Sequence, residues 1–275
     1  MCKIAIHTAH DPAKLADLIL SSWKIMSTSE KDGFGACWIR PDGKLGYVKS
    51  STTTLKSNLP AFIRGFQDGG ICESNGTYLM IHGRTATCGV NAENTHPMIV
   101  GNDALIHNGI VTSKRYHNVE TTCDSELLLH AWRDGIKAIE QDINGYYAFG
   151  NIRINKRKTI LDIVKDDRAQ LHGASTTVSG EEGFIFATTG ELTKTKDSEY
   201  LGEVEPNIWI RFVNGKHVST NYFEPAKVEQ TVKTVELANK SMPGTAYNKM
   251  ADWPAKPDST NWRRPNMQLF DSTGY

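Results

Sequence analysis

The sequence has few cysteines, and none are arranged in a way that would hold a structural metal. There are five in 275 residues, an odd number, and no two have CxxC spacing. This scatter argues against a disulfide framework, and the nine histidines form no HExxH pattern. We therefore expect reduced thiols, no metal and no cofactor.

An excess of charge of one sign is also lacking. The 31 Lys and Arg residues balance the 31 Asp and Glu residues, so the basic excess of a nucleic-acid-binding or membrane-binding protein is absent. No apolar run approaches the ~20 residues that span a bilayer. The first residues lack the apolar core of a secretory signal. These absences predict a cytoplasmic protein whose partners include neither nucleic acid nor membrane.

Short apolar runs bounded by turn residues predict many strands. The expected strands are Lys3–His7, Gly33–Ile39, Leu45–Lys49, Tyr78–His82, Ala104–His107, Tyr146–Ile154, Thr159–Val164, Phe184–Ala187 and Ile208–Val213. Asp11 as cap and Pro12 at the first helical position predict the start of one helix, whose apolar residues run from Leu15 to Met26. Helical spacing also predicts another helix over 124–139 and a short one at Pro60–Phe66. Helices inserted among many strands favour a layered α+β domain.

The composition changes after about Pro225. Lys227–Lys240 has the pattern of a loose helix, and the prolines beyond it break any long element. We expect a domain over 2–225 and an irregular or disordered tail over 226–275. The aromatic residues of the tail either dock a partner or pack on the domain itself.

Cys2 directly follows the initiator methionine. If Met1 is removed, a thiol and a free α-amine stand on one residue. An α-amine titrates near pH ~7.7–8.0 and accepts a proton readily at neutrality, while a thiolate is a strong nucleophile. One residue can therefore supply nucleophile and base, although a cysteine at this position is often incidental.

Three later segments carry groups that suit a polar substrate. Arg84 and Thr87 offer donors for a carboxylate. Asn108-Gly109 offers an amide and a backbone N–H for an oxyanion, and Asp124 offers a carboxylate for an ammonium group. Each also has an ordinary explanation: a solvated arginine, a turn, and a helix N-cap. Together with Cys2 they fit a free amino acid that bears a side-chain amide, namely glutamine.

In this order the segments resemble the class II glutamine amidotransferases, which are N-terminal-nucleophile hydrolases. That family has Cys after Met, an (H)-x-R-x-A-T-x-G stretch, an HNG tripeptide and D-[ST]-E near a helix start. The matching segments here are Met1-Cys2, His82 to Gly89, His107 to Gly109 and Asp124-Ser125-Glu126. The resemblance implies a four-layer αββα sandwich with Cys2 at the start of a central strand, forming a stand-alone glutaminase domain.

The resemblance also implies roles for the matching residues. Cys2 would be the nucleophile, with its α-amine as general base. Arg84 would hold the glutamine carboxylate with help from Thr87, and Asp124 would bind the α-amine. The Asn108-Gly109 pair would stabilise the oxyanion. The implied reaction releases glutamate and ammonia through a Cys2 thioester.

Several positions depart from the family pattern. Lys3 stands where glycine is common, Gly83 and Thr85 replace a threonine and an aromatic residue, and Cys88 replaces a histidine. These departures leave the details of carboxylate binding and gating open. Histidines at 82, 96 and 107 occur where the family often has histidine, which favours support of the site over metal binding.

The family usually fuses its glutaminase to a domain that uses the ammonia, and the segment after Pro225 is too short and polar for one. We therefore expect a separate ammonia-accepting synthetase as partner. Two alternatives stay open: an amidase of the same superfamily acting on a γ-glutamyl or other amide, and an inactive binding or assembly protein with this fold.

Overall fold

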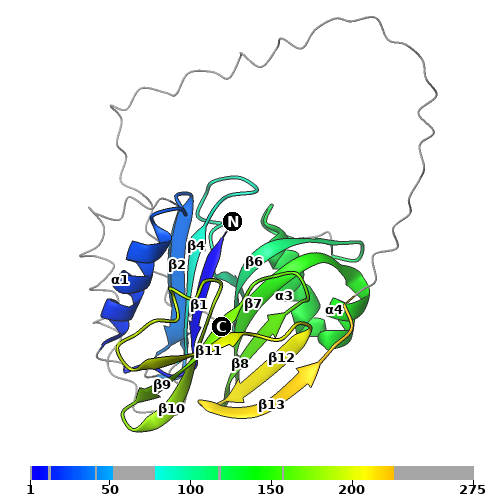
Figure 1. Cartoon of the computed structure of the whole chain (residues 1–275). Coiled ribbons are helices and arrows are strands. Elements are labelled where there is room, and N and C mark those ends of the chain that lie inside the picture. Colours follow the sequence, from blue (N-terminus) through cyan, green and yellow to red (C-terminus); the bar gives the residue numbers. More distant parts are fainter. Residues whose placement is uncertain are drawn as a thin grey trace, which may run out of the picture. The chain divides into compact units, whose positions relative to one another are not determined.

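The computed structural model describes residues 2–11, 14–40, 42–51, 78–116, 119–156 and 158–225. Within these ranges the chain forms two antiparallel sheets and a few helices (Figure 1). The predicted α+β class is confirmed. The helices expected at Pro60–Phe66 and Lys227–Lys240, and the tail over 226–275, lie outside the described residues. None of the described helices is long and apolar enough to cross a membrane.

The first sheet has seven strands and places the N-terminal strand at its centre. In spatial order they are β11 (Ser198–Glu203), β9 (His172–Val178), β10 (Glu181–Ala187), β1 (Lys3–His7), β4 (Leu79–Arg84), β2 (Gly33–Ile39) and β3 (Leu45–Ser50). Strand β1 is hydrogen-bonded on both sides, to β10 and β4. Cys2 therefore directly precedes a central strand, as the resemblance implied.

The second sheet has six strands. In spatial order they are β13 (Lys216–Tyr222), β12 (Ile208–Val213), β8 (Lys158–Lys165), β7 (Ile143–Asn155), β6 (Asp103–Ser113) and β5 (Met98–Val100). The Asn214-Gly215 turn joins β12 to β13, with both residues at positive φ of 49° and 80°. These angles are those of a hairpin turn that asparagine and glycine adopt readily.

Alternate side chains of the central strands belong to different buried clusters, one between the two sheets and one beneath the helix α1. Ile4 and Ile6 of β1 share a buried cluster with Ala104 and Ile106 of β6, so the two sheets pack face to face. Ala5 belongs instead to the cluster beneath α1. Because alternate residues face opposite sides, both faces of the central strands are buried.

The helices cover the outer faces of the sheets (Figure 1). Helix α1 (Leu15–Met26) packs on the first sheet through a cluster that contains Ile19 and Met26. Helices α3 (Asp124–Asp134) and α4 (Ile136–Asp142) pack on the second sheet. The single helix expected over 124–139 is thus divided, because Gly135 has a φ of 105°, which a right-handed helix does not allow.

The remaining differences concern strands that local patterns do not reveal. Strands β5, β9, β11 and β13 were not expected, since β11 and β13 are mostly exposed and β9 is rich in Ser and Thr. Strand β6 was expected to end at His107 but runs on to Ser113, paired residue by residue with β7. The HNG tripeptide therefore lies inside a strand and is not a turn after one.

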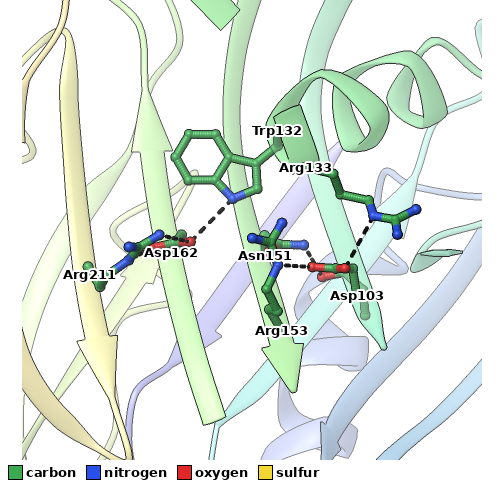
Figure 2. A network of polar contacts seen from close by, with 8 residues as sticks. Asp103, Trp132, Arg133, Asn151, Arg153, Asp162 and Arg211 are labelled. Atoms are coloured by element: carbon green, nitrogen blue, oxygen red, sulfur yellow. Dashed lines mark hydrogen bonds and ion pairs between the residues drawn. The ribbon is translucent and has the colours of Figure 1, made fainter. Parts of the chain in front are cut away.

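A network of charged residues lies between the second sheet and α3 (Figure 2). Asp162 of β8 is fully buried and forms a two-pronged pair with Arg211, Nε to Oδ1 at 2.7 Å and Nη2 to Oδ2 at 2.9 Å. It also accepts the indole N–H groups of Trp132 at 3.2 Å and Trp209 at 3.0 Å. Every part of this buried carboxylate is thus matched by a donor, as burial of a charge requires.

Candidate active site

Every residue that the sequence predicted for the site lines one cavity of about 240 Å³. The predicted residues that line it are Cys2, Arg84, Thr87, Asn108, Gly109 and Asp124. They come from the start of β1, the end of β4 and the loop after it, the middle of β6 and the first turn of α3. Segments far apart in the chain thus place a thiol, a guanidinium group, an amide and a carboxylate around one small space.

Cys2 is placed by its neighbours in the first sheet. Lys3 lies opposite Gly83 in the pairing of β1 with β4, so Cys2 lies beside the end of β4. Its Sγ donates to the backbone carbonyl of Thr85 at 3.5 Å. Burial raises the pKa of this thiol, while the nearby Arg84 guanidinium acts in the opposite direction. The thiol thus needs a base to become a nucleophile at neutral pH.

Arg84 is buried at the end of β4, with only 2% of its surface exposed. Its Nη2 donates to the carbonyl oxygens of Cys88 at 3.3 Å and Gly89 at 3.0 Å, and lies 3.2 Å from the Cys88 sulfur. Its Nη1 has no hydrogen-bond partner among the described residues. Among the described residues Arg84 forms no ion pair. It is therefore a buried cation at the cavity wall, with Nη1 as a spare hydrogen-bond donor.

The HNG tripeptide is fixed from both sides. The ring nitrogen Nδ1 of His107 lies 2.9 Å from Ser125 Oγ at the start of α3, and its carbonyl lies 3.1 Å from His82 Nε2 on β4. Gly109 has a φ of 151°, and a Cβ there would lie 2.6 Å from His107 Nε2 and would overlap the Tyr146 carbonyl. Glycine is therefore required at this position of β6, where a side chain would collide with Tyr146 and His107.

Asp124 is not the N-cap of α3, so the ordinary explanation considered for it in the sequence does not apply. Cys123 occupies the N-cap position without a side-chain cap hydrogen bond, and Asp124 is the first helical residue. Its Oδ2 accepts the backbone N–H of Val111 at 2.8 Å, which ties α3 to β6. This bond holds the carboxylate at the cavity wall.

Three buried histidines surround the site. His82, His96 and His107 are at most 3% exposed, and the rings of the first two lie 3.9 Å apart between centroids. Burial lowers all three pKa values, that of His82 to about 3, so the rings are neutral at pH 7. Among the described residues no group of three His, Cys, Asp or Glu side chains is placed to hold a metal ion.

The sequence did not point to every residue around Cys2. Glu30 is 2% exposed and accepts a hydrogen bond from the hydroxyl of Thr85. No local signal marks it, because a single glutamate between a helix and a strand usually lies at the surface. Tyr146 and Cys123 also line the cavity and were given no role.

Comparison with solved structures identifies the fold. The glutamine phosphoribosylpyrophosphate amidotransferase from B. subtilis complexed with ADP and GMP matches with a TM-score of 0.57 at 18% identity, covering 81% of this chain and 49% of that one. The structure titled as the allosteric regulatory enzyme of purine biosynthesis matches with a TM-score of 0.61 at 17% identity, with the same coverage of 81% and 49%. The chain has the fold of the class II glutamine amidotransferases.

The comparison of structures gives a match over most of the chain, whereas the resemblance in sequence is limited to short motifs. No family model matches the sequence, and no curated protein does. A glutamine aminotransferase class-II domain protein from Silicibacter pomeroyi matches at 15% identity with a TM-score of 0.49, covering 82% of this chain and 100% of that one. The fold assignment rests on the first two structures, of which this chain spans about half the length, 49% in each case.

Proposed function

We propose that this protein hydrolyses the side-chain amide of glutamine to glutamate and ammonia through a thioester on Cys2. The observation that carries the proposal is the convergence of all six predicted residues on one cavity of about 240 Å³. The amidotransferase fold supports it independently. We further propose that the two facing sheets, with α1 on one outer face and α3 and α4 on the other, are the four-layer αββα sandwich of N-terminal-nucleophile hydrolases.

Substrate binding is assigned to three side chains. The spare Nη1 of the buried Arg84 binds the α-carboxylate, with the Thr87 hydroxyl beside it. The Asp124 carboxylate binds the α-ammonium group. Because these charged contacts fix both ends of the amino-acid moiety, the side-chain amide is directed toward Cys2.

The chemistry is assigned to Cys2 and to the Asn108-Gly109 pair. After removal of Met1, the α-amine of Cys2 takes the thiol proton and Sγ attacks the amide carbon. The tetrahedral oxyanion is stabilised by the Asn108 side-chain amide and the Gly109 backbone N–H. The proton is then delivered to the leaving nitrogen, ammonia departs, and water hydrolyses the thioester to release glutamate.

The fate of the ammonia is a proposal that rests on the sequence. We propose that a separate acceptor synthetase receives it, in a cytoplasm where the thiol stays reduced. Purification from the native source with an affinity tag, followed by identification of proteins that co-purify stoichiometrically, tests this. A partner enzyme whose reaction consumes ammonia is expected.

The test of the proposed function is ammonia release from a panel of amides. Glutamine is expected to be the best substrate, and apolar amides without an α-amino acid group are expected to react poorly because Arg84 and Asp124 would find no partners. Labelling of Cys2 by a diazo-ketone analogue of glutamine is expected in parallel. Faster release from an apolar amide or a γ-glutamyl compound would favour the related amidase, and no turnover at all would favour a binding protein.

Replacement of Asn108 by alanine is expected to lower kcat by about 10²–10³-fold with little change in KM, because the lost donor acts on the oxyanion. Steady-state ammonia release measures both constants. Asn102, exposed in the turn before β6, provides the matched asparagine-to-alanine control. A rise in KM at constant kcat would instead assign Asn108 to substrate binding.

A further inference from the structure

Glu30 is a buried carboxylate near Cys2 that the proposed reaction leaves without a role. It lies between α1 and β2 and is 2% exposed. Its Oε1 accepts the Ser29 hydroxyl at 2.7 Å and lies 3.6 Å from Lys3 Nζ, which also donates to Ser29 Oγ at 2.7 Å. Its Oε2 accepts the hydroxyl of Thr85. A charge is rarely buried without purpose, because its desolvation must be offset.

The bond to Thr85 connects Glu30 to the thiol. The backbone carbonyl of the same Thr85 accepts the hydrogen bond from Cys2 Sγ at 3.5 Å. Asp32 adds two further hydrogen bonds to the same segment. The Ala86 N–H donates to Asp32 Oδ2 at 2.7 Å, and the Asp32 N–H donates to the Arg84 carbonyl at 3.0 Å. The segment 30–32 thus holds 84–86 in place beside Cys2.

We propose that Glu30 is a positioning residue for the nucleophile, holding through Thr85 the carbonyl that orients the Cys2 thiol and setting a fixed negative charge beside it. The catalytic meaning of this role rests on the proposed glutamine hydrolysis. The positioning of the thiol and its electrostatic environment are measurable without that reaction. Neither effect requires Glu30 to touch the substrate.

The electrostatic side of the proposal follows from the charges around the thiol. Burial raises the pKa of Cys2 most, the hydrogen bond with the Thr85 backbone and the positive N-terminus lower it, the Glu30 carboxylate raises it, and the Arg84 guanidinium lowers it. Lys3 pairs with Glu30 at 3.6 Å through a side chain that is 20% exposed, so it neutralises that carboxylate only in part. The other titratable or charged groups that line the cavity with the thiol are His96, His107, Cys123 and Asp124, and Asp32 contacts the nearby Ala86 N–H. The α-amine of Cys2 itself is the remaining one.

The experiment measures alkylation of Cys2 by iodoacetamide as a function of pH in the full-length mature protein, with modification read on the N-terminal peptide by mass spectrometry. Glu30→Gln keeps the size of the side chain and a group that can bond Thr85, but removes the charge. We expect the alkylation midpoint to move to lower pH by roughly half a unit to one unit. Asp17→Asn removes an exposed carboxylate of α1 and is expected to leave the midpoint unchanged.

Thr85→Val separates positioning from charge, because it removes the hydroxyl and leaves Glu30 in place. Its kcat for glutamine is expected to fall roughly tenfold or more through misplacement of the thiol, while its midpoint does not move to lower pH as that of Glu30→Gln does, because the Glu30 charge remains. An unchanged midpoint in Glu30→Gln, or an equal shift in Asp17→Asn, would overturn the proposal. A wild-type protein that releases no ammonia but shows the Glu30→Gln shift would refute the proposed function alone.

Discussion

Cys2→Ala is expected to abolish ammonia release from glutamine, with a loss of at least roughly 10³-fold in kcat, because no other group can form the thioester. Cys88 and Cys123 are the other cysteines near the site. Cys88 is not among the residues that line the cavity, and Cys123, which is, is buried with a pKa raised by burial to about 12. Neither thiol is therefore suited to replace Cys2.

Two measurements make this result specific. Labelling by the diazo-ketone analogue is expected to disappear in Cys2→Ala, and Cys88→Ala, the matched control on the loop after β4, is expected to keep it. The intact mass of the purified protein is expected to lack Met1, since an amide nitrogen cannot act as the base. Equal labelling of wild type and Cys2→Ala, or full activity with Met1 retained, contradicts the mechanism.

Asp162→Ala is expected to be the most destabilising single change away from the cavity, at about 3–5 kcal/mol. Removal of one partner from a buried ion pair leaves the other charge uncompensated. Here it leaves the Arg211 guanidinium and the indole N–H groups of Trp132 and Trp209 without their acceptor (Figure 2). The free energy of unfolding, from denaturant titration followed by tryptophan fluorescence, measures the loss.

Two control variants are needed for Asp162. One keeps the shape of the side chain without its charge, and the other breaks an exposed ion pair in place of a buried one. Asp162→Asn keeps an acceptor for the indole groups and is expected to lose less stability than the alanine variant. Asp134→Ala breaks an exposed pair with Arg115 and is expected to have a much smaller effect, because surface pairs contribute little. A loss as small for Asp162→Ala as for Asp134→Ala would refute a structural role for the network.

The sequence predicted best those elements whose own residues show a clear pattern of apolar side chains. Strands β1, β2 and β12 have the predicted bounds. Apolar residues bury both faces of β1 and β2, and in β12 they alternate between buried and partly buried positions. Helix α1 carries its apolar residues from Leu15 to Met26 as predicted, but its N-cap is Lys14 and not Asp11. Edge strands such as β11 and β13 carry mostly exposed residues, so their backbone pairing leaves little trace in the pattern of side chains.

The candidate site, like the fold, was predictable from the sequence only in part. The sequence by itself determined which chemical groups are available, because Cys2, Arg84 and Asp124 are identified by residue type and by their place in recurrent motifs. Only the tertiary structure decided that these groups share one cavity, that Asn108 lies within β6, and that Glu30 is buried against Thr85. The physical reason is that hydrophobic periodicity is a local property, whereas hydrogen bonds and desolvation at the site join residues far apart in the chain.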